Sequence, residues 1–163
     1  MVHRFRHILL AAVLGGLFIQ TAWADERPAP KSLWQTVMAL PPTGQPSMPR
    51  KSWVLREREI VLDLPLLRVL KDAGARPLPR MTVELFNKPD PELDVISTVS
   101  RINDTAVIRG AFKLPSVGDF TFMVTGNLLT GTIQMGNRFY KIEHIANGRL
   151  QLVEIDPGKL PLD

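Results

Sequence analysis

The second half of the chain alternates apolar and polar residues in short runs separated by turn residues. Two such runs, residues 93–102 and 105–114, are joined at Asn103-Asp104. Four more runs follow, each rich in β-branched or aromatic residues with a period close to two: 120–125, 128–135, 138–145 and 149–155. A period of two places successive side chains on opposite faces of a β-strand. The pattern therefore predicts six consecutive antiparallel strands.

The residues between these runs favour tight turns. Pairs of glycine with asparagine or aspartate recur at intervals of eight to eleven residues, at 118–119, 126–127, 136–137 and 147–148. Glycine and asparagine adopt a positive φ at low cost, as two-residue hairpin turns require. The spacing predicts a meander whose strands are joined by hairpins.

Two further strands and one helix are predicted before the meander. Residues 53–62 have a strand-like pattern, and residues 81–85 alternate as a half-buried strand does. Between them, Asp63 suits the N-cap of a short helix, with Pro65 in its first turn and Gly74 at its end. These elements predict a mainly β (α+β) fold, a curved antiparallel sheet or meander of about eight strands with one short helix.

The N-terminus has the pattern of a secretory signal peptide, residues 1–24. A pair of arginines precedes an uncharged apolar run at residues 8–19, and the small-x-small triplet Ala22-Trp23-Ala24 follows. The run has 12 residues, whereas a membrane-spanning helix needs about 20. We therefore expect cleavage after Ala24, export to the periplasm or exterior of a bacterium, and no membrane span in the mature protein.

The mature chain is expected to hold one domain behind an extended lead-in. Residues 25–50 contain six prolines, which leave little room for regular structure: Pro28, Pro30, Pro41, Pro42, Pro46 and Pro49. Residues 33–38 interrupt this stretch and could form one docked turn. Residues 51–163 are predicted to be a single β domain.

Charge and cysteine content narrow the function classes. The chain has 20 Lys+Arg and 16 Asp+Glu, and the signal peptide holds two of the basic residues and no acids, so the remaining 139 residues carry 18 against 16, or +2. So small a charge gives no argument for binding nucleic acid or an anionic membrane. Because cysteine is absent, the chain forms no disulfide and offers no thiol nucleophile or thiolate ligand.

The sequence predicts no catalytic apparatus, no cofactor and no metal site. His144 is the only histidine after residue 24, the His-Glu-x-x-His motif is absent, and no glycine-rich phosphate loop opens a helix. One histidine cannot supply the usual zinc ligand set. We therefore expect His144, beside Glu143, to be an exposed or salt-bridged side chain.

Two acids and several aromatic residues are alternative candidates for a functional site. Glu154 and Asp156 are two apart on a predicted strand and hence share a face, as paired catalytic acids would. A solvated strand end is the more common explanation of such a pair. The aromatic residues could form a stacking surface, although alternating positions in strands more often belong to a core: Trp53, Phe112, Phe120, Phe122 and Phe139.

Three parts of the chain carry a resemblance to a known family. Residues 56–70 look like a strand followed by a Leu-Asp-Leu-x-x-Leu-Arg helix start, and Thr82–Phe86 looks like the next strand. The strongest likeness is in the strands and turns at 129–133, 138–142 and 153–157. From about Leu33 onward, the chain resembles the N-terminal propeptide-like region of secreted bacterial reprolysin-like zinc metallopeptidases, including the peptidyl-Asp type. The zinc-binding helix of such enzymes has no counterpart in these 163 residues, so the resemblance implies neither protease activity nor a catalytic residue.

The resemblance implies a free-standing prodomain-like protein that binds a secreted zinc metallopeptidase in trans, as an inhibitor or folding helper. Such a protein would cover the cleft and place a polar group on the zinc or displace its water. An acid or the tail 158–163 could serve, although Asp119 is more simply a turn residue. The candidate partner-binding residues are Asp119, His144, Glu154, Asp156 and Asp163.

Other function classes stay open. The chain could be a periplasmic or surface module that binds a protein or glycan through a sheet face or edge, since fold does not dictate function. It could also be the remnant of a truncated protease gene. An enzyme acting through Glu154, Asp156 or His144 ranks last, because no supporting constellation accompanies these residues.

Overall fold

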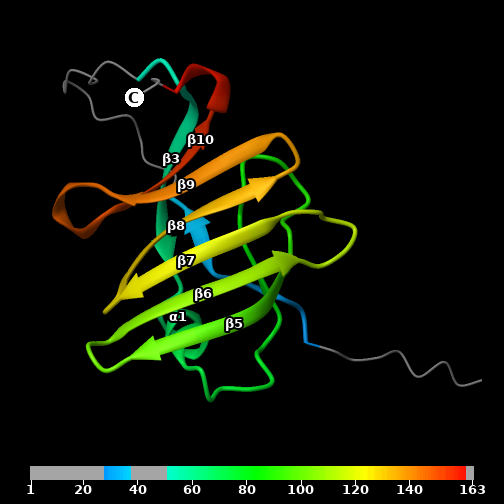
Figure 1. Cartoon of the computed structure of the whole chain (residues 1–163), viewed down its shortest axis with the longest axis vertical. Coiled ribbons are helices and arrows are strands. Elements are labelled where there is room, and N and C mark those ends of the chain that lie inside the picture. Colours follow the sequence, from blue (N-terminus) through cyan, green and yellow to red (C-terminus); the bar gives the residue numbers. More distant parts are fainter. Residues whose placement is uncertain (1–27, 38–50, 161–163) are drawn as a thin grey trace, which may run out of the picture.

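The computed structural model describes residues 28–37 and 51–160. The predicted signal peptide and Asp163 lie outside the described residues. Within them, an eight-stranded antiparallel sheet curls into a half-barrel, and one helix lies on its concave side (Figure 1). The mainly β fold predicted from the sequence is confirmed.

The sheet has the strand order β2-β3-β10-β9-β8-β7-β6-β5. Its strands are β2 (Trp34–Thr36), β3 (Val54–Leu62), β5 (Leu93–Arg101), β6 (Thr105–Phe112), β7 (Asp119–Thr125), β8 (Leu128–Met135), β9 (Arg138–His144) and β10 (Leu150–Ile155). Strands β5 to β10 follow one another as the predicted meander, and β3 then pairs with β10. A separate two-residue parallel pair joins β1 (Lys31–Ser32) to β4 (Met81–Thr82).

Most of the predicted turns are present between the strands. Gly126 and Gly136 open two-residue turns with φ of 60° and 57°. Asn147 and Gly148 lie with Ala146 in a short 3₁₀ turn, η1 (Ala146–Gly148), before β10. The tight turn predicted at Gly118-Asp119 is wrong, because Asp119 already belongs to β7 and a six-residue loop, 113–118, precedes it.

Helix α1 (Leu64–Lys71) begins as predicted. The Asp63 carboxylate accepts a hydrogen bond from the Leu66 backbone N–H at 2.9 Å, which satisfies one of the free donors of the first turn. The helix ends before Gly74, because Asp72 turns the chain and its carboxylate accepts from the Gly74 N–H at 2.8 Å. Its buried side chains Leu66, Leu67 and Leu70 face the core.

The segment after α1 crosses the concave side of the sheet with little strand pairing. Met81, Val83 and Leu85 are buried, as their alternation predicts, but only the first two residues of the segment form a strand. At Glu84 the backbone carbonyl instead accepts side-chain hydrogen bonds from Trp34 Nε1 at 2.8 Å and from Arg58 Nη2 at 2.7 Å. Side chains thus take the place of a neighbouring strand.

The proline-rich lead-in contributes to the core. Instead of one docked turn, residues 31–36 form β1 and β2, and both Leu33 and Trp34 have an exposed fraction of 0%. The Trp34 ring packs edge-on against Phe122, with ring centroids 6.0 Å apart. The hydrophobic core therefore includes residues that precede position 51.

Candidate partner-binding surface

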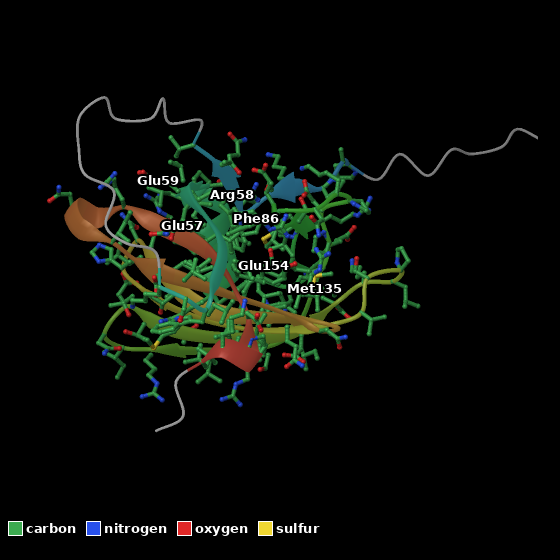
Figure 2. The ribbon with its side chains drawn as sticks, turned by 90° about the horizontal axis from the view of Figure 1, so that it is seen from above. Glu57, Arg58, Glu59, Phe86, Met135 and Glu154 are labelled. Carbon is green, nitrogen blue, oxygen red and sulfur yellow. The ribbon has the colours of Figure 1, made fainter. Side chains whose placement is uncertain are left out.

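A cluster of charged and aromatic side chains lies inside the curl of the sheet. In Figure 2, Arg58, Phe86 and Glu154 lie within the curl, whereas Glu57 and Glu59 of the same strand as Arg58 point away from it. The guanidinium carbons of Arg56 and Arg58 each lie 4.8 Å from the centroid of the Phe86 ring. Such contacts between cations and the ring face stabilise the segment that crosses the sheet.

The acids of this cluster neutralise its arginines. Glu154, only 4% exposed, accepts from Arg56 Nε and forms an ion pair with Arg56 Nη2. Arg58 lies 3.7 Å from the Glu84 carboxylate. Burial lowers the pKa of the Arg58 guanidinium, against the opposing charge of Glu84. For Glu84, burial acts to raise the carboxyl pKa, but the hydrogen bond from the Thr36 backbone N–H and the charge of Arg58 lower it overall. We interpret this cluster as structural: it holds the segment that crosses the sheet against strands β3 and β10.

Glu154 and Asp156, the candidate catalytic pair, do not share a site. The solvated strand end expected for Glu154 is wrong, because its carboxylate is buried against Arg56. Asp156 lies beyond the end of β10, where its side chain accepts from the Gly158 N–H at 3.0 Å and pairs with Lys159 at 3.3 Å. β10 ends at Ile155, and Asp156 is the N-cap of the short 3₁₀ helix η2 (Pro157–Lys159), so the alternation of the strand does not extend to it.

The other candidate residues differ in their accessibility. Asp119 is exposed at the start of β7 and, by strand alternation, shares the convex face of the sheet with Met123. His144 is exposed at the end of β9, as expected.

Among the described residues, no group of three or more His, Cys, Asp or Glu is arranged to hold a metal ion. No helix in this part of the chain is long and apolar enough to cross a membrane.

A second ionic cluster joins the start of β5 to the segment before β4. The Glu92 carboxylate accepts from Arg80 Nη2 at 2.6 Å and Nε at 3.1 Å, and from Lys113 Nζ at 2.7 Å. Glu92 is 14% exposed, whereas Arg80 and Lys113 are 40% and 48% exposed. The hydrogen bonds from Arg80, with those from Lys113, lower the pKa of Glu92 to about 2.

The lowered pKa of Glu92 predicts a loss of stability in acid. The stabilisation is present above the ordinary pKa of 4.5 and is lost as the pH falls from there toward about 2. This shift corresponds to at most about 3 kcal/mol, and screening of the half-exposed cations reduces the expected contribution to about 1–2 kcal/mol. Urea unfolding gives the free energy of unfolding at pH 6 and at pH 3. The difference between these two values should be smaller for Glu92→Gln than for the wild type. An equal difference for both proteins would contradict the assignment, and Glu143→Gln, at an exposed ion pair, serves as control.

The convex face of the sheet carries an apolar strip that reaches its edge. Val99 of β5 pairs with Val107 of β6, which pairs with Met123 of β7, so the three side chains are neighbours on one face. Val99 and Met123 are 55% and 50% exposed. We call these three residues, with the exposed Arg101 and Arg109 beside them, the edge patch.

The backbone of β5 is open along its outer edge. β5 is the last strand in the sheet order, and no backbone hydrogen bond joins residues 93–101 to any described segment other than β6. On the concave side, by contrast, the Ser100 hydroxyl donates to the Lys71 carbonyl at 2.6 Å and Arg76 donates to the Thr98 hydroxyl at 3.2 Å. A partner can therefore reach β5 from its edge and from the convex face.

A separate apolar groove lies at the other end of the convex face. It has a volume of about 390 Å³, and its aromatic walls are Trp53 and Phe139. The remaining aromatic residues of the predicted set, Phe112, Phe120 and Phe122, are buried in the core. Lys51 and Leu160 also line the groove.

Strand alternation alone could have placed Val99, Val107 and Met123 on one face, but the sequence does not show which strand ends the sheet.

Comparison of the chain with known proteins adds no functional information. No protein-family model, no curated protein and no solved structure matches this chain.

Proposed function

We propose that the chain is an exported, non-catalytic domain that binds a secreted zinc metallopeptidase in trans through the edge patch, as an inhibitor or folding helper. We infer the binding surface from the apolar strip of Val99, Val107 and Met123, which reaches an open sheet edge. The choice of partner rests on a likeness to a metallopeptidase propeptide, which is carried by residues 56–70, 82–86, 129–133, 138–142 and 153–157.

The physical argument for a binding role comes from how soluble proteins treat sheet edges. Another chain can readily pair with an exposed sheet edge that has apolar side chains. Monomeric proteins therefore usually cover such an edge or place charged residues on it. In β5 the exposed Ile96 and Val99 lie on such an edge, and Ile102 follows in the adjoining turn. Burial of these side chains against a partner would remove apolar surface from water and would satisfy the open backbone groups of β5.

Of the candidate acids, Asp119 is best placed to contact a partner seated on the edge patch. It lies on the same strand and face as Met123 and is exposed. Glu154 is held by Arg56, and Asp156 is held by Gly158 and Lys159, so both would have to break existing contacts. This proposal therefore assigns Asp119, rather than the other two, to the interface.

The groove supports a second candidate function, a periplasmic or surface module that binds an apolar or glycan ligand. Trp53 and Phe139 offer aromatic faces at a concave site of the size that small ligands occupy. The two functions use different residues at different ends of the convex face, so substitutions can separate them.

The test uses the purified protein and a zinc metallopeptidase secreted by the same organism. The double variant Val99→Ser, Met123→Ser should weaken binding tenfold or more, because two apolar side chains are lost from the interface. Trp53→Ala, as the matched control at the groove, should leave binding unchanged. Binding is measured by biolayer interferometry, and the rate of peptide hydrolysis by the protease is followed in parallel.

The result can separate the alternatives. If only Trp53→Ala weakens binding, the groove is the interface and the edge patch is wrong. If no metallopeptidase of the organism binds the wild-type protein, the protease partner is wrong. The melting temperature of each variant shows whether it remains folded.

A further inference from the structure

The charges around the edge patch indicate which kind of strand fits β5. We propose that β5 accepts an extended segment of the partner between Ser97 and Arg101, and that this segment presents an acidic, an apolar and an acidic residue at alternate positions on the convex face. The inference rests on the proposed function, because it names the chemistry of the segment that the edge patch binds.

The alternation of β5 sets the three positions. Ser97, Val99 and Arg101 are two apart, so their side chains lie on the same face, and Val99 is the exposed apolar residue in the middle. A strand added to β5 places its own alternate side chains opposite these three. The central position is therefore apolar, and the position opposite Arg101 favours a carboxylate.

The second acidic position follows from Arg109. Arg109 lies on β6 directly across from Ser97. Neighbouring strands are about 4.8 Å apart, so an added strand would lie about 10 Å from β6. The short serine leaves room for the long arginine side chain to extend over it toward the edge. A carboxylate opposite Ser97 can therefore meet the guanidinium of Arg109.

Both arginines are available for a partner. Arg101 and Arg109 are exposed, and neither makes an ion pair or a side-chain hydrogen bond with a described residue. Some other exposed cations of the fold have acidic partners, as Arg149 has in Glu59 at 3.1 Å. Two unpaired guanidinium groups that flank an exposed valine are the charge complement of an acidic-apolar-acidic strand.

The local structure limits the segment to a short stretch. A register shift between Val95 and Ser97 interrupts the regular pairing of β5, and such a bulge bends a strand and ends simple pairing. Beyond Arg101 the chain turns toward β6. The open length is thus residues 97–101, which matches three side chains on the convex face.

The same charges disfavour a second copy of the chain as the occupant. Antiparallel pairing of two β5 strands about Val99 would place Arg101 of one copy opposite Ser97 and beside Arg109 of the other. Each end of the pair would then hold two like charges, which destabilises strand pairing. A segment with carboxylates at these positions relieves the repulsion.

The test uses the full-length protein and two synthetic peptides with blocked ends, Thr-Glu-Thr-Val-Thr-Glu-Thr and Thr-Lys-Thr-Val-Thr-Lys-Thr. Titrations followed by amide resonances give the affinity and the location of binding. The Glu peptide should shift the resonances of residues 97–101. It should bind about tenfold more tightly than the Lys peptide, because only the Glu peptide can form the two exposed ion pairs with Arg101 and Arg109. The double variant Arg101→Glu, Arg109→Glu should reverse this preference.

A matched control changes the net charge equally at other sites. Lys31 and Arg68 are exposed and lack side-chain partners among the described residues, so Lys31→Glu, Arg68→Glu should retain the preference for the Glu peptide. Equal binding of both peptides, shifts outside β5, or no reversal in the Arg101, Arg109 variant would overturn the inference. If the metallopeptidase binds the wild type and that variant equally well, this inference fails while the proposed function stands.

Discussion

Replacing Trp34 with alanine should lower the free energy of unfolding by about 3–5 kcal/mol, as truncation of a fully buried tryptophan does. The side chain is 0% exposed, packs against Phe122, and donates a hydrogen bond to the Glu84 carbonyl. Alanine leaves a cavity between the sheet and the segment that crosses it, and it leaves that carbonyl with only the Arg58 bond. Urea unfolding monitored by circular dichroism measures the loss.

Trp34→Phe is the milder substitution at this position. Phenylalanine keeps an aromatic ring in the site but loses the indole N–H and part of the buried ring volume, so we expect a smaller cost of about 2 kcal/mol. If Trp34→Ala unfolds at the same urea concentration as the wild type, β2 is not part of the cooperative core. The assignment of residues 31–36 to the domain would then be wrong.

Substitution of Gly131 by alanine should destabilise the protein by about 3 kcal/mol or more, because overpacking here meets backbone. A Cβ at Gly131 would lie 2.3 Å from the Thr121 carbonyl oxygen and 2.8 Å from Phe122 Cδ1. Gly131 and Phe122 are directly paired across β8 and β7. The aromatic ring therefore occupies the space that a side chain on the concave face would need.

The same arrangement recurs two strands along, where Gly110 pairs with Phe120 and a Cβ would meet the Asp94 carbonyl at 2.2 Å. The Phe120 and Phe122 rings are stacked with centroids 4.7 Å apart. Glycines beneath aromatic rings allow a sheet to curve while its concave face stays packed. These two positions therefore help to form the half-barrel.

Gly136→Ala is the matched control for Gly131→Ala. No atom lies within 4 Å of a Cβ at Gly136, but its φ is +57°, so only the backbone strain of about 1–2 kcal/mol is expected. Equal midpoints of urea unfolding for Gly131→Ala and Gly136→Ala would contradict the role given to the aromatic rings.

Local pattern predicts the elements of this fold well because local physics determines them. The runs from residue 93 onward become β5 to β10, and Asp63 caps α1. Two-residue turns form at Gly126 and Gly136, where a positive φ is needed. In each case the residues that decide the outcome are neighbours in the sequence.

Features that depend on distant partners could not be predicted in this way. Glu154 is buried because Arg56, 98 residues earlier in the chain, neutralises it. Trp34 becomes part of a strand because Leu62 of β3 lies opposite it. The edge patch likewise depends on β5 being last in the sheet, and the strand order is set by the pairing of β3 with β10. No local pattern in the sequence contains this information.

The measurement that most directly tests the proposed function is hydrogen–deuterium exchange of the full chain, alone and with a zinc metallopeptidase secreted by the same organism. Strand addition would satisfy the open backbone of β5, so we expect exchange to slow most at residues 97–101, with the groove around Trp53 unchanged. Slowed exchange confined to the groove, or no change anywhere in β5, would contradict the proposed interface.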